Sequence, residues 1–222
     1  MKKIFFVYIF ILLSSCFMIV EVVSNIGNGI VIYIDPGHGG SDGGAIGKDD
    51  TYEKDIVLSI AKKLETVLKK NKYRVIMTRD TDTDLASYGS KNRKVEDIHK
   101  RTRLINESEC DLFISIHANS FPSGKSYGAQ TFFNAKNENG KALAKYIQDS
   151  LILQLGNTYR LSKSINDVYL MDKANKAGCL IEVGFMSNPI DLQNLKDSKY
   201  QDRLVHSIYL GIEEYLKEFV KK

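Results

Sequence analysis

Cysteine is scarce in this 222-residue sequence, which contains only three. Cys16 lies in an apolar N-terminal leader, and Cys110 and Cys179 stand alone in the rest of the chain. A disulfide framework needs paired cysteines at short spacings, and a cysteine-based zinc site needs clustered ones. Both are therefore excluded, and any metal ion has to be held by histidine and carboxylate side chains.

Proline is also scarce, and the net charge is small. With 3 Pro, 43% hydrophobic and 26% charged residues, the composition is that of a globular chain, which excludes disordered, collagen-like and coiled-coil proteins. The 31 Lys and Arg exceed the 27 Asp and Glu by a net charge of only +4, and they are scattered. We therefore expect no nucleic acid partner. The length fits one domain.

The first 25 residues are predicted to be a leader. Lys2 and Lys3 precede an apolar run from Ile4 to Val20, which is the order of an export signal. The run is at the lower limit for spanning a bilayer, so residues 1–25 are predicted to be a signal peptide or an N-terminal membrane anchor, with lipidation at Cys16 as a third alternative. Residues 26–222 are then expected on the outer side of the cytoplasmic membrane.

Beyond the leader, strand-like and helix-like segments alternate, which predicts a single three-layer α/β domain. Apolar runs predict strands at 30–34, 73–78, 111–117, 130–133 and 179–185. Several are apolar on both faces, as in a central, mostly parallel sheet flanked by helices. Apolar stripes predict helices through 56–68 and 204–219, and the polar segment 80–97 is predicted to be the longest surface loop.

Three polar side chains stand at or near the ends of predicted strands. His38 follows the first strand in a glycine-rich turn, His117 ends another, and Glu182 lies inside an apolar strand. In an α/β sheet the carboxyl ends of the strands line the ligand crevice. A carboxylate in an apolar strand needs a partner, a metal ion or a function. A site is therefore expected at the C-terminal ends of the strands.

The glycine-rich turn also allows other interpretations. Asp42 replaces the third glycine of a dinucleotide-binding turn, and the sequence around Gly47 lacks the other residues of a P-loop. Ser41 lies in a Gly-x-Ser-x-Gly pattern, but a nucleophile elbow joins strand, serine and helix directly, and here several residues separate Ser41 from the strand. A serine hydrolase remains an alternative of lower rank.

A metal site accounts better for the two histidines. Two His and one carboxylate form a common catalytic zinc set that leaves a position for water. Glu53, in the first turn of the first predicted helix, is the candidate carboxylate, although an acidic residue there more often serves the helix dipole. Taken singly, His38 and His117 are also more often structural residues than ligands, so the residues alone leave the choice open.

Six sequence blocks occur in the order of one known family. They are Asp35-Pro36-Gly37-His38-Gly39-Gly40 with Gly43-Gly44-Ala45; Glu53-Lys54-Asp55 with Ile60-Ala61; Thr78-Arg79-Asp80; Arg101 with Asn106; residues 111–119, ending His117-Ala118-Asn119; and Glu182-Val183-Gly184-Phe185 with Ser187-Asn188-Pro189. Through them the chain resembles the zinc-dependent N-acetylmuramoyl-L-alanine amidases with a single α/β catalytic domain. The resemblance covers nearly all of residues 26–222.

The resemblance implies the roles of individual residues. His38, Glu53 and His117 are implied to bind one catalytic Zn²⁺, and Glu182 is implied to be the catalytic carboxylate. The implied reaction is hydrolysis of the amide between N-acetylmuramic acid and the L-alanine of the peptidoglycan stem peptide. The rival of another class is a wall-binding module that keeps zinc without turnover.

Further residues and partners follow less directly. Asp35 and Asn119 are expected to support the ligating histidines. Arg79 and Arg101 are expected either to orient carboxylates or substrate or to form plain surface ion pairs. A short, anchored catalytic domain is similar to the sporulation amidases, which prepare spore-cortex peptidoglycan for muramic-δ-lactam formation. That likeness implies a location in the forespore intermembrane space, a role at germination and an activating or targeting protein partner.

Overall fold

The structure is a computed structural model that describes residues 29–220. The predicted leader, residues 1–25, lies outside the described residues. The elements follow in the order β1 (Val31–Pro36), α2 (Glu53–Lys70), β2 (Arg74–Met77), α3 (Arg93–Glu107), β3 (Leu112–Asn119), β4 (Gln130–Phe133), α4 (Glu138–Leu155), β5 (Lys163–Ser164), α5 (Tyr169–Lys173), β6 (Ala177–Phe185), α6 (Pro189–Lys196) and α7 (Ser198–Val220).

The strands form one six-stranded sheet in the order β2-β1-β3-β6-β4-β5. All neighbouring pairs are parallel except β6 and β4, which run antiparallel. The predicted α/β fold with a mostly parallel central sheet is confirmed. Because β1, β3 and β6 are parallel neighbours, their carboxyl ends meet at one edge of the sheet.

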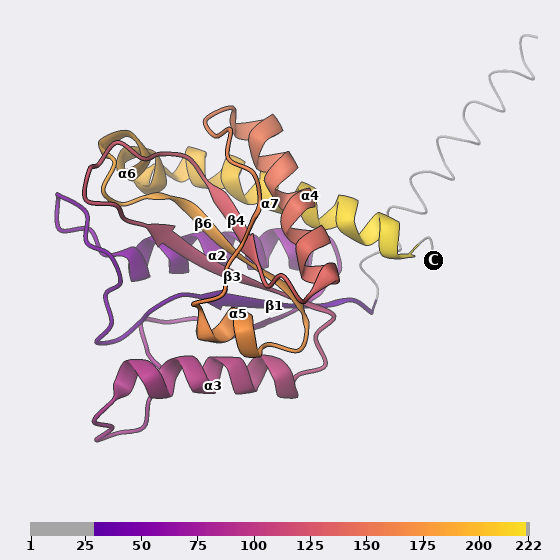
Figure 1. Ribbon diagram of the computed structural model, residues 1–222, viewed down its shortest axis with the longest axis horizontal. Coiled ribbons are helices and arrows are strands. Elements are labelled where there is room, and N and C mark those ends of the chain that lie inside the picture. Colours follow the sequence, from indigo (N-terminus) through magenta and orange to yellow (C-terminus); the bar gives the residue numbers. More distant parts are fainter. Residues whose placement is uncertain (1–28, 221–222) are drawn as a thin grey trace, which may run out of the picture.

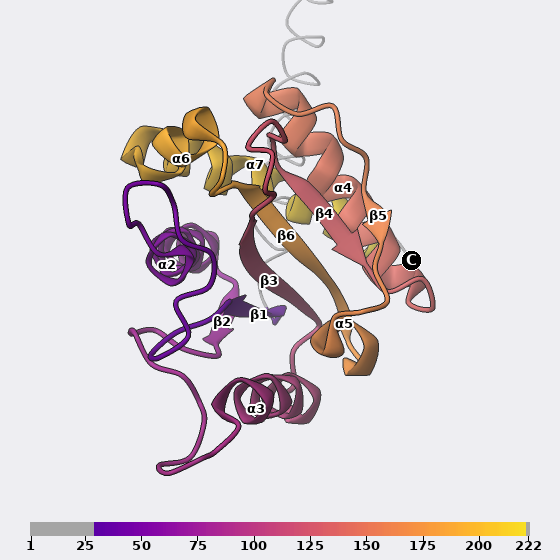
Figure 2. The same cartoon turned by 60° about the vertical axis from the view of Figure 1, so that its left-hand side comes forward.

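Helices cover both faces of the sheet, with α3 and α5 on one side and α2, α4 and α7 on the other (Figure 1; Figure 2). Alternation along β1 explains the two cores: Ile32 and Ile34 pack with α2, α4 and α7, whereas Val31 and Tyr33 pack with α3 and α5. Side chains of a strand alternate between the two faces, so a strand buried on both sides is apolar throughout.

Seven of the twelve elements described above lie where the sequence predicts them, namely β1, β2, β3, β4, β6, α2 and α7, whereas α3, α4, β5, α5 and α6 were not among the predicted segments. The two-residue strand β5 is too short to leave a pattern, and the expected loop 80–97 is interrupted because α3 begins at Arg93. Asp97 is buried inside α3, where it binds Arg101 and the backbone N–H of Leu85. The charged residues at this end of the polar segment therefore form an ion pair inside the protein. Within residues 29–220, no helix has the length and apolar character needed to cross a membrane.

Candidate metal centre at the carboxyl edge of the sheet

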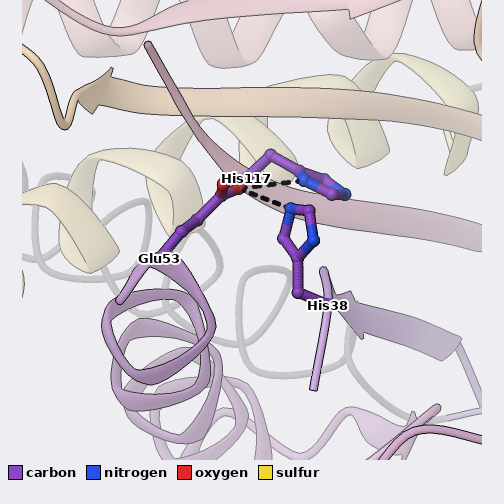
Figure 3. A group of neighbouring side chains, drawn as sticks. All are labelled: His38, Glu53 and His117. Atoms are coloured by element: carbon purple, nitrogen blue, oxygen red, sulfur yellow. Dashed lines mark hydrogen bonds and ion pairs between the residues drawn. The ribbon is translucent and has the colours of Figure 1, made fainter. Parts of the chain in front are cut away.

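Three side chains converge at the carboxyl edge of β1 and β3. Oε1 of Glu53 lies 3.0 Å from Nε2 of His38 and 3.1 Å from Nδ1 of His117. Figure 3 shows the carboxylate of Glu53, at the start of α2, pointing at both imidazole rings. One donor atom from each residue lies within 4.8 Å of the others. Two imidazole nitrogens and a carboxylate oxygen are a donor set suited to zinc.

Glu53 is fixed more firmly than a residue that only serves a helix dipole. It is 4% exposed, although it is the first residue of α2. Besides the imidazoles, the backbone N–H groups of Ala118 and Ala45 donate to its two oxygens at 2.9 and 2.8 Å. Burial alone would raise the pKa of Glu53, but hydrogen bonds with His117 and His38 hold it well below its usual range. The carboxylate is therefore ionised and immobile, as a metal ligand should be.

Two glycines make room for the three side chains. A Cβ added at Gly37 would lie 2.2 Å from Cε1 of His117. At Gly44 it would lie 2.6 Å from Oε2 of Glu53 and 2.7 Å from Cδ2 of His38, and the φ of +68° at Gly44 itself favours glycine. The glycine-rich turn thus serves close packing around the cluster, which explains its composition without a bound phosphate.

Two buried arginines hold the backbone of the loop that carries His38. His38 has a φ of 60°, which is uncommon for a residue with a side chain. Arg101 donates to the carbonyl oxygens of His38 and Pro36, and Arg79 donates to those of Pro36 and Gly37. The two arginines are 1% and 4% exposed, so they are not surface ion pairs. They support the loop backbone.

Asp35 and Asn119 were expected to support the histidines, but neither hydrogen-bonds to an imidazole. Asp35 accepts from Arg101, Thr78 and Ser115 at 2.7 to 2.9 Å. Burial opposes its ionisation, but the charge of Arg101 and these hydrogen bonds hold the pKa of Asp35 below its usual value. The side-chain oxygen of Asn119 accepts from the N–H of Ser120. Asp35 therefore acts on the loop through Arg101.

Asp42 is the residue that sequence reasoning missed. Its Oδ2 lies 2.8 Å from Nδ1 of His38, so it fixes the ring that points its other nitrogen at Glu53. In the sequence it was only the residue that breaks a dinucleotide-binding pattern. A turn between His38 and Asp42, closed by paired backbone hydrogen bonds between Gly39 and Asp42, creates the contact. Spacing alone gave no signal for it.

Glu182 lies beside the cluster, across the sheet. Within the β3–β6 ladder it stands directly opposite His117, and paired residues project to the same face. Its Oε2 is buried and has no hydrogen-bond partner among the described residues. Burial raises the pKa of Glu182 to about 7, with the negative charge of Glu53 adding to the effect and the two histidines opposing it. A carboxyl group with this pKa can take up and release a proton near neutral pH.

The serine alternative gains no support from the geometry. Ser41 is exposed, and its hydroxyl lies 3.4 Å from Asp84. It sits in a turn far ahead of α2, where a nucleophile elbow would join strand and helix directly. Cys110 and Cys179 are buried free thiols and serve as small residues of the core.

Comparison with known proteins identifies relatives over most of the chain. The family model described as N-acetylmuramoyl-L-alanine amidase matches residues 32–214. The germination-specific N-acetylmuramoyl-L-alanine amidase of Bacillus subtilis is 49% identical over 194 residues, covering 86% of this chain and 81% of that protein. The amidase LytC of Bacillus subtilis is 31% identical over 191 residues, covering 85% of this chain but only 36% of LytC.

A solved structure agrees with these relatives. The CwlD amidase from Clostridioides difficile, in complex with the GerS lipoprotein, superposes with a TM-score of 0.83 at 37% identity. The match covers 86% of this chain and 100% of that one. The family match over residues 32–214, the relatives and the shared fold therefore show that the chain belongs to the N-acetylmuramoyl-L-alanine amidase family.

Proposed function

We propose that this chain is a zinc-dependent amidase that hydrolyses the amide between N-acetylmuramic acid and the L-alanine of the peptidoglycan stem peptide. One observation carries the mechanism. The buried, unpaired Oε2 of Glu182 lies on the strand position opposite His117, next to a cluster of two histidines and a glutamate. A carboxyl group without a partner is costly inside a protein, so its place beside a metal-binding set indicates use in catalysis.

His38, Glu53 and His117 would hold the metal ion through Nε2, a carboxylate oxygen and Nδ1, the atoms that face one another in the cluster. When bound, zinc would supply a Lewis acid that polarises the scissile carbonyl and lowers the pKa of water to about 7. Asp42 would keep the ring of His38 in its binding orientation. Arg79 and Arg101 would hold the backbone of the same loop.

Glu182 would carry the proton. Burial raises the pKa of this carboxyl group, and the charge of bound zinc would lower it again, so it can be ionised at neutral pH and accept a proton from the attacking water. The same carboxyl group would then deliver that proton to the departing nitrogen of the alanine, which leaves as a neutral amine. One residue thereby serves as base and then as acid.

The relatives support a place for this reaction in spore formation. The Bacillus subtilis relative is named as germination-specific, and the Clostridioides difficile neighbour is a complex with a lipoprotein. We propose that the substrate is spore-cortex peptidoglycan, whose stem peptides are removed for muramic-δ-lactam formation. The chain would work outside the cytoplasmic membrane, in the forespore intermembrane space, held by its leader and assisted by a protein partner of the lipoprotein kind.

The test measures zinc content and stem-peptide release from purified peptidoglycan together. We expect one zinc per chain and release that stops on chelation and returns with added zinc. Glu182→Gln should keep its zinc and lose about 10²- to 10⁴-fold in rate, because the proton carrier is gone. Ser41→Ala is the control and should match the wild type.

Two results would contradict the proposal. Release that persists without metal and stops in Ser41→Ala would identify a serine hydrolase. Bound zinc with no release from vegetative or cortex peptidoglycan, with and without a lipoprotein partner, would identify a wall-binding module.

A further inference from the structure

A row of side chains crosses the sheet at the catalytic edge. Glu182 on β6 is paired with His117 on β3 on one side and with Gln130 on β4 on the other. Directly opposed residues project to the same face, with Cβ atoms about 5 Å apart. The row therefore runs from the metal centre, over the proton carrier, to the antiparallel strand β4.

Resting on the proposed function, this row of side chains indicates in which direction the substrate lies across the sheet. The scissile carbonyl belongs at the metal centre, and the departing nitrogen belongs at Glu182, which protonates it. The peptide attached to that nitrogen then continues away from the metal centre, over Gln130 and past the edge of β4. Arg160 lies at this place, with its Nη1 3.4 Å from Oε1 of Gln130.

Arg160 is placed at this edge by three contacts. Its Nε donates to the carbonyl oxygen of Tyr127 at 3.0 Å, and its guanidinium lies 4.9 Å from the ring centre of Phe185. Its Nη1 lies 3.4 Å from Oε1 of Gln130, a long contact that a stronger acceptor could replace. The Gln130 amide in turn donates to the carbonyl oxygen of Leu161.

Arg160 also has hydrogen-bond donors that no described residue uses. Among residues 29–220 it makes no ion pair, and no hydrogen bond uses its Nη2. The charge of Arg160 acts on Asp191 without an ion pair, and Oδ2 of Asp191 accepts instead from the N–H groups of Gly128 and Phe185. Three cations near the loop that carries His38 are paired by contrast: Lys54 with Asp82 at 2.7 Å, Lys94 with Asp42 at 2.7 Å and Arg93 with Asp84 at 2.5 Å.

We infer that Arg160 binds a carboxylate of the departing stem peptide and so selects substrates whose second residue carries a free carboxylate. A half-buried guanidinium stacked on an aromatic ring keeps its orientation, and its planar fork matches a carboxylate with two parallel hydrogen bonds. The side chains of its neighbours Tyr159 and Leu161 are exposed, so the segment beside β4 that carries Arg160 faces solvent and a peptide can reach it.

The experiment compares two small probes. One is an N-acetylmuramoyl-L-alanyl dipeptide whose second residue has a free α-carboxylate, and the other is the same compound with a carboxamide there. Binding is measured by calorimetry on zinc-loaded Glu182→Gln, and turnover on the enzyme with Glu182 intact. In each background Arg160→Gln should weaken the carboxylate probe by about 10- to 100-fold, through Kd and KM, and change the carboxamide probe little.

Two further variants control for other effects. Arg160→Lys keeps the charge without the fork, so it should restore part of the preference. Arg203→Gln is the matched control, because Arg203 also stacks on an aromatic ring, that of Tyr200, and makes no ion pair among the described residues, but it lies on α7. It should leave both probes unchanged.

The outcomes separate the inference from the proposed function. If Arg160→Gln weakens both probes equally, or lowers kcat alone, Arg160 only supports the edge of β4 and the inference is wrong. If the enzyme with Glu182 intact releases nothing, the proposed function fails in that assay, whereas the calorimetric preference still tests Arg160. Equal binding of both probes by the chain with Arg160 intact also overturns the inference.

Discussion

Some of the residues at the carboxyl edge of the sheet can be identified from the sequence, whereas others can be identified only from the folded structure. His38, His117 and Glu182 could be selected because they are polar residues at or near the ends of apolar strands. Glu53 could not be separated from an ordinary helix-dipole residue until the structure placed both imidazoles against it. Asp42 became visible only through the turn that returns it to His38.

The buried carboxyl of Glu182 should set a pH dependence of stability in the chelated protein. Its pKa is about 7 in the fold and 4.5 in the reference state, so the proton is bound more tightly in the folded chain. Stability should therefore fall as pH rises from about 4.5 to 7, by up to about 3 kcal/mol, and level off above that. Glu182→Gln should remove this fall, so the variant should exceed the wild type in stability at pH 8 and equal it at pH 4.

Urea unfolding between pH 4 and pH 8 measures this effect. Glu107→Gln, an exposed carboxylate paired loosely with Arg103 at 4.0 Å, controls for the loss of any single carboxylate. A wild-type stability that rises between pH 5 and 7, relative to Glu182→Gln, would contradict the assignment of a raised pKa.

Among the elements, the short helix α6 depends on its first residues. The side chain of Asn188 accepts from the N–H groups of Ile190 and Asp191 at 3.0 and 3.1 Å, and Pro189 follows as the first helical residue. Asp191 in turn holds the N–H of Phe185 at the end of β6. The cap thus orders the end of the strand that carries Glu182.

Asn188→Ala should cost about 1 kcal/mol in the free energy of unfolding, because two backbone donors lose their acceptor. Asn92→Ala is the matched control, since Asn92 occupies the same position before α3 but makes no capping hydrogen bond with its side chain. Thermal or urea unfolding of both variants checks the difference. Equal losses would show that the cap contributes nothing specific.

Element boundaries were predictable where an apolar stripe or run was long. The helix through residues 56–68 and the strand through 179–185 both appear, extended by a few residues at their ends. The start of α3 within the expected loop 80–97 was missed because polar residues, Asp97, Arg101 and Thr102, share its buried face with Ile105 and weaken the apolar periodicity.

For the whole molecule, stability and metal binding should be separable. Two hydrophobic clusters cover the two faces of the sheet, whereas His38, Glu53 and His117 lie at its carboxyl edge. We therefore expect the hydrophobic core to hold the fold without a metal ion. This differs from zinc fingers, which unfold without metal.

Chelation should leave a cooperatively folded chain with an unchanged far-ultraviolet circular dichroism spectrum. Zinc at a thousandfold excess over its Kd should raise stability by about 4 kcal/mol, which corresponds to about 10 °C in Tm. Scanning calorimetry with chelator and with excess zinc measures the shift. A chelated chain without a cooperative transition would show that the metal centre is required for folding.

The position of β6 in the sheet has a consequence for biosynthesis. The three residues of the cluster, His38, Glu53 and His117, all precede residue 118, but Glu182 comes later, on a strand that must insert between β3 and β4. We expect a chain cut before residue 177 to contain the three proposed metal ligands but to lack the proposed proton carrier. On the proposed mechanism, the chain therefore becomes able to hydrolyse its substrate only after this central strand has joined the sheet.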